Sequence, residues 1–330
     1  MKSAVLGYLK ERCPNYVSGE EICRSLNISR TSVWKYVSTL RNEGYEIEAR
    51  SRLGYRLVGT PDLLLPDEVV TGLDTLFCGQ VYHHHLSLPS TNTTAQELAR
   101  AGAPEGTVVL AEEQTGGRGR LSRAWVSPLG GLWFSIILRP TVLPARAPEI
   151  TFLAAVACVQ AFERYPGVDV GIKWPNDLVW RDRKLGGILT ELSGEFDRVN
   201  HVVLGVGINV NLNEDDFPPG LRAVTTSVSA ITGFPVSRRR LLRELLVSLE
   251  HWYRVWLADG FSPVVEAWKR MHSWLDRPVR VVNVEGEWTG IAVGIDDDGA
   301  LLLKTDNGLT KRIIAGDVLL RDGERLDPRS

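Results

Sequence analysis

The segment Gly116-Gly117-Arg118-Gly119-Arg120 lies between two short apolar runs, at residues 107–111 and 133–137. Both runs have the length and composition of buried strands, so we expect two strands joined by a loop rich in glycine and arginine. Glycine lets the backbone approach a ligand closely, and arginine binds an anion through two parallel hydrogen bonds. The loop is therefore predicted to hold a phosphate or a carboxylate, although such residues also occur in ordinary mobile loops.

Length and composition restrict the classes of protein to which this loop could belong. The 330 residues exceed what one hydrophobic core usually serves, so we expect two or three domains. The net charge of −2 means that nucleic-acid binding would need a local basic patch. No apolar run reaches the roughly 18 residues of a membrane helix and no signal peptide begins the chain, so no membrane partner is expected. Four scattered cysteines without a Cys-x-x-Cys pair favour the reducing cytoplasm.

The first sixty residues carry the pattern of a helix-turn-helix. Ser18 is expected to cap a short helix and Ser29 to cap a longer one, in which Val33, Val37 and Leu40 form one apolar face. A short helix, a tight turn and an amphipathic second helix are typical of this motif. The opposite face of the second helix then offers side chains that can reach phosphates or base edges.

Residues 44–48 and 54–57 alternate like two strands around a basic turn, which predicts the wing of a winged helix. Residues 1–60 contain ten Lys or Arg and six Asp or Glu, a local charge of +4. This charge favours a DNA-binding surface over the alternative, a small helical interaction domain with solvated basic residues. The residues expected to contact DNA are Ser29, Arg30, Thr31, Ser32, Lys35, Tyr36, Arg50 and Arg52.

A polar group follows the next expected strand, at residues 81–88. The three histidines inside this strand, at 83–85, point to alternate faces and cannot converge on a metal ion. Ser90, Thr91 and Asn92 then lead into a helix. They are ordinary cap residues, yet at a strand-to-helix junction their hydroxyl and amide groups can also hydrogen-bond a polar ligand.

Three later segments combine apolar strands with charged or glycine positions. Residues 171–177 contain a lysine and an aspartate separated by a proline, which places both charges at a strand edge. Residues 184–191 and 202–211 have the composition of buried strands whose glycines let a ligand or a backbone approach closely. A helix over 147–164 and a leucine-striped helix over 238–257 are expected to pack in the core.

The motifs of common nucleotide-binding and hydrolytic enzymes are missing. The sequence has no Gly-Lys dipeptide and therefore no Walker A loop. Val210 and Ser122 stand where the dinucleotide fingerprint would need a glycine after its first two. Neither Gly-x-Ser-x-Gly nor His-Glu-x-x-His occurs. Hydrolases, kinases and dehydrogenases are therefore disfavoured.

From about residue 275, short apolar runs alternate with turn residues. Regular spacing of this kind predicts a small β-barrel, with an edge extension of the main sheet as the alternative.

Taken in order, these motifs resemble those of the biotin–protein ligases. They are Ser-Thr-Asn at 90–92, Gln114, Gly-Arg-Gly-Arg at 117–120, Gly-Gly-Leu-Trp-Phe-Ser at 130–135, Lys-Trp-Pro-Asn-Asp-Leu at 173–178, Lys-Leu-Gly-Gly-Ile-Leu-Thr-Glu at 184–191 and Gly-Val-Gly-Ile-Asn-Val-Asn at 205–211. With the winged helix in front, the whole chain resembles the bifunctional type that also represses the biotin operon. One departure is Ser122, where the loop of this family usually has another glycine.

The resemblance implies a multidomain α+β fold in three parts. Residues 1–60 would form a winged helix-turn-helix and residues 61–274 a central mixed-sheet α/β domain that is class II synthetase-like. Residues 275–330 would form a small SH3-like β-barrel.

The resemblance also implies a two-step reaction. Biotin and ATP give biotinyl-AMP and pyrophosphate, and the biotin then passes to a lysine of a biotin carboxyl carrier protein. Further implied partners are Mg²⁺, operator DNA and a second copy of the chain. Two alternatives remain: a lipoate–protein ligase, and a transcription factor whose large domain only senses a ligand.

The first step brings two anions together, so it needs cations and backbone N–H groups around the phosphate. The expected catalytic residues are Arg118, Arg120 and Lys184, and biotin is expected to contact these three together with Ser90, Thr91, Asn92, Gln114 and Gly119. ATP is assigned to Gly117, Arg118, Gly119, Arg120, Lys173, Asn209 and Asn211, and Mg²⁺ to Asp177.

Overall fold

The computed structural model describes residues 1–320 of the chain, so the last ten residues of the expected third domain lie outside the described residues. The chain divides into two compact units, Met1–Leu63 and a second unit that begins at Leu64. The division expected after residue 60 therefore has a counterpart a few residues further on, whereas the one expected after residue 274 lies inside the second unit.

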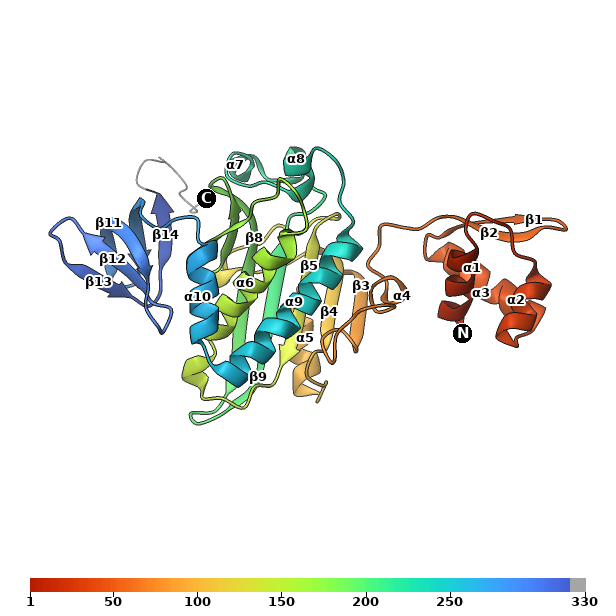
Figure 1. The fold of residues 1–330 in the computed structure, drawn as a ribbon, viewed down its shortest axis with the longest axis horizontal. Coiled ribbons are helices and arrows are strands. Elements are labelled where there is room, and N and C mark those ends of the chain that lie inside the picture. The colour runs from red at the N-terminus through yellow and green to blue at the C-terminus, as the bar shows by residue number, and fades with distance from the viewer. Residues whose placement is uncertain (321–330) are drawn as a thin grey trace. The chain divides into compact units, whose positions relative to one another are not determined.

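The first unit contains three helices and a hairpin (Figure 1). The helices are α1 (Lys2–Arg12), α2 (Gly19–Leu26) and α3 (Arg30–Asn42). The predicted caps are present, because Ser18 Oγ accepts a hydrogen bond from Glu21 N at 3.0 Å and Ser29 Oγ accepts one from Ser32 N at 3.1 Å. The predicted apolar face of α3 is buried against α1 and α2.

The hairpin consists of β1 (Glu46–Arg50) and β2 (Gly54–Gly59), which pair antiparallel. At its turn, Gly54 has φ +101°, and an added Cβ would lie 2.0 Å from the carbonyl oxygen of Val17. Tyr55 exchanges backbone hydrogen bonds with Val17, so this glycine lets the segment before α2 run beside β2. The predicted winged helix-turn-helix is thus confirmed.

A seven-stranded mixed sheet forms the centre of the second unit, in the order β3-β4-β5-β9-β8-β7-β6. Its strands are β3 (Tyr82–Leu88), β4 (Val108–Gln114), β5 (Leu132–Leu138), β6 (Gly171–Lys173), β7 (Asp177–Trp180), β8 (Arg183–Gly194) and β9 (Val199–Ile208). Only β3 and β4 run parallel, and every other neighbouring pair is antiparallel.

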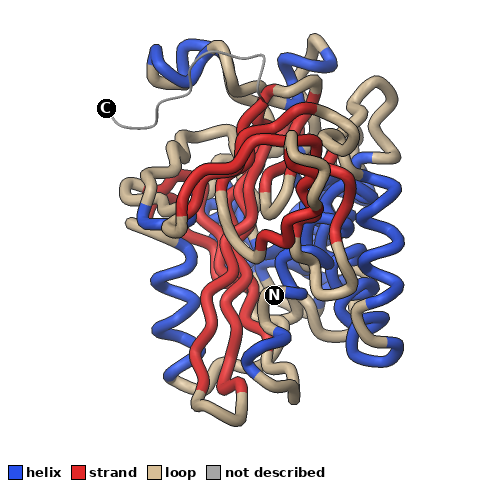
Figure 2. Tube along the Cα trace, turned by 90° about the vertical axis from the view of Figure 1, so that its left-hand side faces the viewer, coloured by secondary structure: helices blue, strands red, loops and turns tan. Residues whose placement is uncertain are grey.

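Helices cover both faces of this sheet (Figure 2). On one face, α5 (Thr91–Arg100) packs on β4, β5 and β9. On the other lie α6 (Glu149–Phe162), α9 (Arg238–Asp259) and α10 (Ser262–Met271). The shorter helices are α4 (Pro66–Val69), α7 (Pro219–Arg222) and α8 (Val228–Thr232), with 3-10 turns η1 (Arg120–Ser122), η2 (Pro144–Arg146) and η3 (Glu214–Asp216).

The alternation of side chains along the strands explains these two layers. On β4, Val109 packs towards α5, whereas Val108 and Leu110 belong to the larger core under α6 and α9. The leucine stripe of α9 is buried in that larger core, as predicted. The segment Pro144–Phe162 is long and apolar enough to cross a membrane by length and composition, but 67% of it is buried inside the protein, as in a core helix.

The histidines of β3 follow the same alternation. His84 bonds Glu112 Oε1 at 2.8 Å through Nε2, and Glu112 also pairs with Arg238 at 2.8 Å. The described residues contain no group of three or more His, Cys, Asp or Glu that could hold a metal ion.

The C-terminal strands form a second, separate sheet, in the order β13-β12-β11-β10-β14. They are β10 (Pro278–Asn283), β11 (Gly286–Ile295), β12 (Leu301–Thr305), β13 (Thr310–Ile313) and β14 (Asp317–Leu320), all antiparallel. The alternative of an edge extension of the main sheet is therefore wrong.

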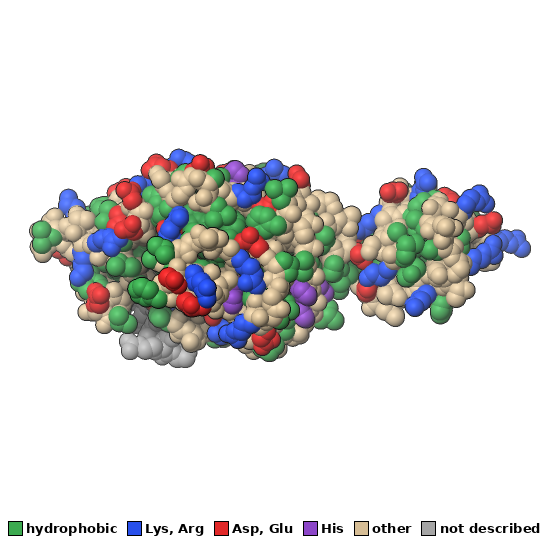
Figure 3. Space-filling model, turned by 90° about the horizontal axis from the view of Figure 1, so that it is seen from below, with side chains coloured by type: hydrophobic (Ala, Val, Ile, Leu, Met, Phe, Trp, Pro, Cys, Tyr) green, Lys and Arg blue, Asp and Glu red, His purple; other side chains and the backbone are tan. Residues whose placement is uncertain are grey.

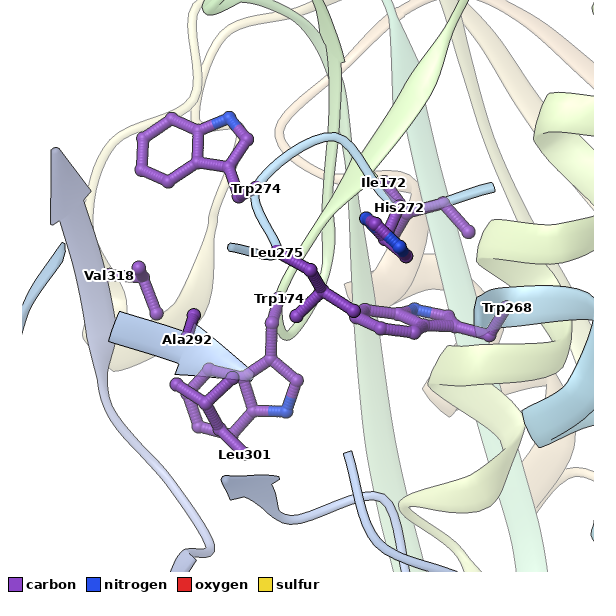
Figure 4. Close-up of a pocket in the computed structure, with 9 residues that line it drawn as sticks. All are labelled: Ile172, Trp174, Trp268, His272, Trp274, Leu275, Ala292, Leu301 and Val318. Atoms are coloured by element: carbon purple, nitrogen blue, oxygen red, sulfur yellow. The ribbon is translucent and has the colours of Figure 1, made fainter. Parts of the chain in front are cut away.

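A small, mostly apolar cavity lies between this second sheet and the residues around α10 and β6 (Figure 4). Its walls are Ile172, Trp174, Trp268, His272, Trp274, Leu275, Ala292, Leu301 and Val318. None of the residues predicted to bind biotin or ATP lines it, so the candidate site lies elsewhere.

Candidate active site

The Gly/Arg loop folds back on itself as an irregular hairpin between β4 and β5. Gln114 N donates to Ser127 O at 3.0 Å, Trp125 N to Gly117 O at 2.9 Å and Gly119 N to Arg123 O at 2.7 Å. The last of these bonds uses the Gly119 N–H group that the sequence analysis assigned to a phosphate. Gly117 is required for close approach, because an added Cβ would lie 2.4 Å from Trp125 O.

The tip of this hairpin has an uncommon backbone. Leu121 and Ser122 have φ +54° and +59°, in the left-handed region that favours glycine. The departure noted at Ser122 therefore has a physical meaning, since the glycine usual in the family would adopt this conformation without strain.

Thr91 and Asn92 on α5, Gln114 on β4, Ser127 in the loop and Ser135 on β5 form what we call the polar network. Gln114 Oε1 accepts from Thr91 N at 2.8 Å, and Gln114 Nε2 donates to Ser127 Oγ at 2.8 Å. Ser135 Oγ lies 2.8 Å from Thr91 Oγ1 and donates to Asn92 Oδ1 at 2.6 Å. The structure thus brings together three residues predicted for biotin and adds two serines that the sequence analysis missed.

Ser90 is the N-cap of α5, but its side chain makes no capping hydrogen bond. The alternative interpretation, that the Ser90 hydroxyl is there to cap the helix, is therefore not supported. Asn92 sits directly on the sheet, since a Cβ added to Gly205 would lie 2.1 Å from Asn92 Oδ1. This glycine makes room for a protein side chain.

Lys173, Asp177 and Lys184 meet at the other end of the site. Lys173 ends β6 and Asp177 begins β7, and the two pair across a tight hairpin; the sequence analysis expected them along one strand edge. Asp177 Oδ1 lies 2.7 Å from Lys184 Nζ, and Asp177 Oδ2 lies 3.8 Å from Lys173 Nζ. Burial by itself would raise the pKa of Asp177, but Lys184 and Lys173 together lower it. Burial lowers the pKa of Lys173, and Asp177 partly opposes that effect.

Arg120 and Arg123 of the Gly/Arg loop extend to the same end of the site as Lys173, Asp177 and Lys184. Arg120 Nη1 donates to Asn176 Oδ1 at 3.1 Å and to Gly316 O at 3.4 Å. Arg123 pairs with Asp317, which begins β14 in the C-terminal sheet. We call Lys173, Lys184, Arg120 and Arg123 the cation cluster. Its four cations face two carboxylates, Asp177 and Asp317, which leaves an excess of two positive charges.

Trp125 lies between the polar network and the cation cluster. Its indole covers Gly207, where an added Cβ would be 2.7 Å from Trp125 Nε1, and its ring centre is 5.1 Å from Lys184 Nζ. Nε1 is buried without a hydrogen-bond partner. An unpaired buried donor is uncommon in native structures, and here it marks a polar group able to bind a ligand. The sequence signal that could have pointed to this residue is a tryptophan inside a loop of small and charged residues.

The side-chain amides of Asn209 and Asn211 hydrogen-bond the backbone of the segment after β9. Asn209 Nδ2 donates to Thr226 O at 3.0 Å. Asn211 Oδ1 accepts from Val236 N at 2.8 Å, and its Nδ2 donates to Val236 O at 2.9 Å. Both amides therefore brace the segment between β9 and α9.

Asp177 does not provide a magnesium site by itself. Mg²⁺ prefers one or two carboxylates together with phosphate oxygens. Both oxygens of Asp177 already pair with ammonium groups, so a divalent cation there would lie beside two positive charges. This carboxylate fits the metal only when phosphate oxygens complete the ligand set.

The surface predicted for DNA lies on the outside of the first unit. Arg30, Thr31 and Lys35 on α3 are exposed, as are Arg50 and Arg52 at the hairpin, while Ser32 and Tyr36 are partly covered. Figure 3 shows Lys and Arg side chains at the end of this unit that carries the hairpin. Trp34, one of the largest exposed apolar side chains at 64%, also lies on α3 and was missed by the sequence analysis.

Comparison with known proteins identifies the family. The Biotin/lipoate A/B protein ligase family matches residues 86–209, the Biotin protein ligase C terminal domain matches 275–321 and an HTH domain matches 2–56. The chain belongs to the Biotin/lipoate A/B protein ligase family.

Its relatives include bifunctional members of that family. The Bifunctional ligase/repressor BirA of Bacillus subtilis is 44% identical over 306 residues, covering 92% of this chain and 94% of that protein. The protein of the same name from Escherichia coli is 32% identical over 311 residues, covering 93% and 94%. Among solved structures, the biotin protein ligase from Aquifex aeolicus in complex with biotin and ATP has a TM-score of 0.64 at 28% identity, covering 73% of this chain and 99% of that one. The chain is a ligase of this family with an N-terminal HTH domain, as predicted from the sequence.

Proposed function

We propose that the chain joins biotin to ATP to form biotinyl-AMP and pyrophosphate, and then transfers biotin to a lysine of a carboxyl carrier protein. We place this activity in the cytoplasm, where ATP and the carrier are available. One observation carries the proposal. The neutral polar network lies at the base of the Gly/Arg loop, and the cation cluster, with its excess of positive charge, lies at the tip of the same loop. Such a pairing suits a substrate with a neutral ring at one end and an anion at the other.

In the first step, a carboxylate oxygen of biotin attacks the α-phosphorus of ATP, and the bond to the pyrophosphate oxygen breaks. Two anions approach each other, so the barrier falls where cations face both of them. Lys184 can meet both groups, because its ammonium is a compact charge on a flexible stem. Arg120 and Lys173 then neutralise charge that develops on the phosphate oxygens. Arg118 supplies a further positive charge on the side of the polar network, where it pairs with Glu191.

The ureido ring of biotin needs neutral donors and acceptors. Ser90, Thr91, Asn92 and Gln114 supply them, and the buried strand β5 supplies an apolar wall for the rest of the ring system. We assign Asn209 and Asn211 an indirect role with ATP, through the segment that their amides hold.

Mg²⁺ would enter with the phosphates of ATP and screen their charge, and Asp177 is its proposed protein ligand in that complex. Without nucleotide, Asp177 instead holds Lys184 in place. Isothermal titration of Mg²⁺ into the protein alone should therefore give no heat, and Asp177→Asn should lose the part of the affinity for ATP that added Mg²⁺ provides in the wild type.

In the second step, the amine of the acceptor lysine attacks the carbonyl carbon of biotinyl-AMP, and AMP leaves. No residue of the chain becomes covalently modified, so no protein nucleophile is required.

Biotin-dependent exchange of labelled pyrophosphate into ATP tests the first step. We expect Arg120→Ala to reduce this exchange at least tenfold while the protein stays folded. Near-normal exchange in Arg120→Ala would remove this residue from the proposed machinery. Transfer of labelled biotin to an acceptor fragment tests the second step and excludes a protein that only senses its ligand.

The lipoate–protein ligase alternative uses the same adenylation chemistry on a different acid. Competition between biotin and lipoate for adenylate formation separates them. The polar network favours biotin, because the dithiolane ring of lipoate offers no N–H donor or carbonyl to these side chains.

We further propose that the winged helix represses transcription as part of a homodimer, since two half-sites need two DNA-binding heads. β8 pairs with β7 only as far as Gly187, so its residues 188–194 have β9 on one side and no strand of the described chain on the other. A free edge of this kind can pair with a second copy. Fluorescence anisotropy with a two-fold DNA site should show binding that biotinyl-AMP strengthens and salt weakens. Arg52→Ala should weaken that binding at every sequence tested.

A further inference from the structure

Glu191 is a charged residue in the part of β8 that packs towards α5. Its register partner on β9 is Val203, which is buried in the small core beneath α5. From this position Glu191 Oε2 accepts a hydrogen bond from Asn92 Nδ2 at 2.7 Å. The same carboxylate pairs with Arg118 Nη2, at 3.2 Å from Oε1 and 3.4 Å from Oε2. It thus touches both the polar network and the Gly/Arg loop.

Two acceptors fix the direction of hydrogen bonding at Asn92: the Glu191 carboxylate at 2.7 Å and, more weakly, the backbone carbonyl of Leu189 at 3.4 Å. A carboxylate can only accept, so the amide of Asn92 must turn its NH₂ group to Glu191 and its oxygen to Ser135. Ser135 must then donate its single hydroxyl proton to Asn92 Oδ1, at 2.6 Å. Asn92 is 4% exposed, so water cannot replace either partner freely.

The bond to Arg118 acts on the loop. The side chains of Arg118 and Glu191 are 43% and 28% exposed, so this ion pair contributes little to stability. Arg118 Nη2 also lies 3.4 Å from Thr93 Oγ1 on α5. The pair therefore directs where the guanidinium lies, between α5 and β8, rather than stabilising the fold.

We propose that Glu191 is a positioning residue that sets the donor and acceptor pattern offered to the ureido group and holds Arg118 beside it. This inference rests on the proposed function, because it concerns the recognition of biotin. Glu191 touches neither reacting atom; it acts through Asn92 and Arg118.

Replacing Glu191 by glutamine tests the direction of hydrogen bonding with little change in shape. A glutamine can present either its oxygen or its NH₂ group to Asn92, so only the long 3.4 Å bond to Leu189 O still opposes a turn of the Asn92 amide. Ser135 would then face an NH₂ group and could no longer donate to residue 92. We expect Glu191→Gln to raise the KM for biotin about tenfold, with the KM for ATP and kcat changed less than twofold.

A biotin analogue whose ureido oxygen is replaced by an imino N–H offers a donor where biotin offers an acceptor. The wild-type protein should prefer biotin, and Glu191→Gln should reduce that preference about tenfold in calorimetric titrations without ATP. Glu191→Asp keeps a group that can only accept, so its preference should stay close to that of the wild type even where both ligands bind more weakly. A residue with a purely structural role would not change this ratio.

Glu195→Gln is the matched control, because Glu195 lies past the end of β8 in an exposed pair with Arg198. It should behave as the wild type in both measurements. The inference is overturned if folded Glu191→Gln keeps the wild-type ratio of the two affinities, or if Glu191→Asp loses the ratio as fully as Glu191→Gln. Failure of the proposed function would look different, since the wild-type protein would then show no biotin-dependent exchange at all.

Discussion

The polar network and the cation cluster use opposite kinds of chemistry at the two ends of one site. In the polar network, neutral groups bond one another, and Thr91, Asn92 and Ser135 are almost completely buried. In the cation cluster, four cations share two carboxylates, so its charge is incompletely balanced. The polar network can select a ligand by shape and hydrogen bonding. The cation cluster carries uncompensated positive charge before a ligand binds and can therefore stabilise an anion that enters the site.

The largest effect is expected at the cation cluster. Lys184→Ala removes the ammonium that pairs with Asp177 at 2.7 Å and should lower biotinyl-AMP formation by about 10²–10³-fold. Lys304→Ala, on an exposed position of β12, is the control and should leave the rate unchanged. Single-turnover measurement of adenylate formation checks both, and equal rates in the two variants would contradict the division of roles.

A change in the polar network should affect binding more than chemistry. Gln114→Ala removes the acceptor of Thr91 N and the donor to Ser127, so we expect the KM for biotin to rise roughly 10–100-fold. The KM for ATP should change by less than about threefold. Exposed Gln80 offers the control substitution Gln80→Ala. A fall in kcat without a change in the KM for biotin would show that the network does more than bind.

The substitution Asp177→Asn tests the charge balance of the cation cluster through the pH dependence of stability. The variant removes the carboxylate that pairs with Lys173 and Lys184, so the free energy of unfolding at pH 7 should fall by roughly 1–3 kcal/mol. The pKa of Asp177 is lowered in the folded state, so its contribution is fully present above its ordinary pKa and is lost as pH falls through the lower, folded value. The difference between wild type and variant should therefore be constant from about pH 5 to 7 and shrink only below about pH 4. Urea unfolding across this range measures it, and a difference that vanished already at pH 6 would contradict the assignment.

The smallest effect is expected at the loop tip. Ser122→Gly should stabilise the protein by about 0.5–1 kcal/mol, because Ser122 has φ +59°, which glycine adopts without strain. Ser122→Ala retains a Cβ and serves as the control for loss of the hydroxyl. Thermal unfolding should give a higher Tm for Ser122→Gly than for Ser122→Ala, and the reverse order would show that glycine relieves no strain at this positive φ.

Local patterns predicted much of this molecule. The caps at Ser18 and Ser29, the apolar face of α3 and the stripe of α9 depend on neighbouring residues, and each was recognised from its spacing. The polar group at residues 90–92 was noticed because it follows an apolar strand, whereas Gln114 was named only through the resemblance to the biotin–protein ligases.

The contacts that complete the site could not be found in this way. Glu191 meets Asn92 across 99 residues of sequence, and Arg120 meets Gly316 across 196. No spacing rule links such partners, because they are joined by the order of strands in the sheets. Asn209 and Asn211 show the converse: their motif marked them as polar residues beside glycines, but tertiary packing directs their amides to backbone groups.

The contact of the loop with the C-terminal sheet also has a consequence for the order of synthesis. Arg120 and Arg123 bond Gly316 and Asp317, which follow them by 196 and 194 residues. At a translation rate of about 5–20 residues per second, these partners are made roughly 10–40 s after the arginines. During that interval the growing chain carries both arginines without two of the groups that hold them. A chain truncated before residue 316 would therefore lack two of the partners of Arg120 and Arg123, even though every cation of the cluster had already been translated.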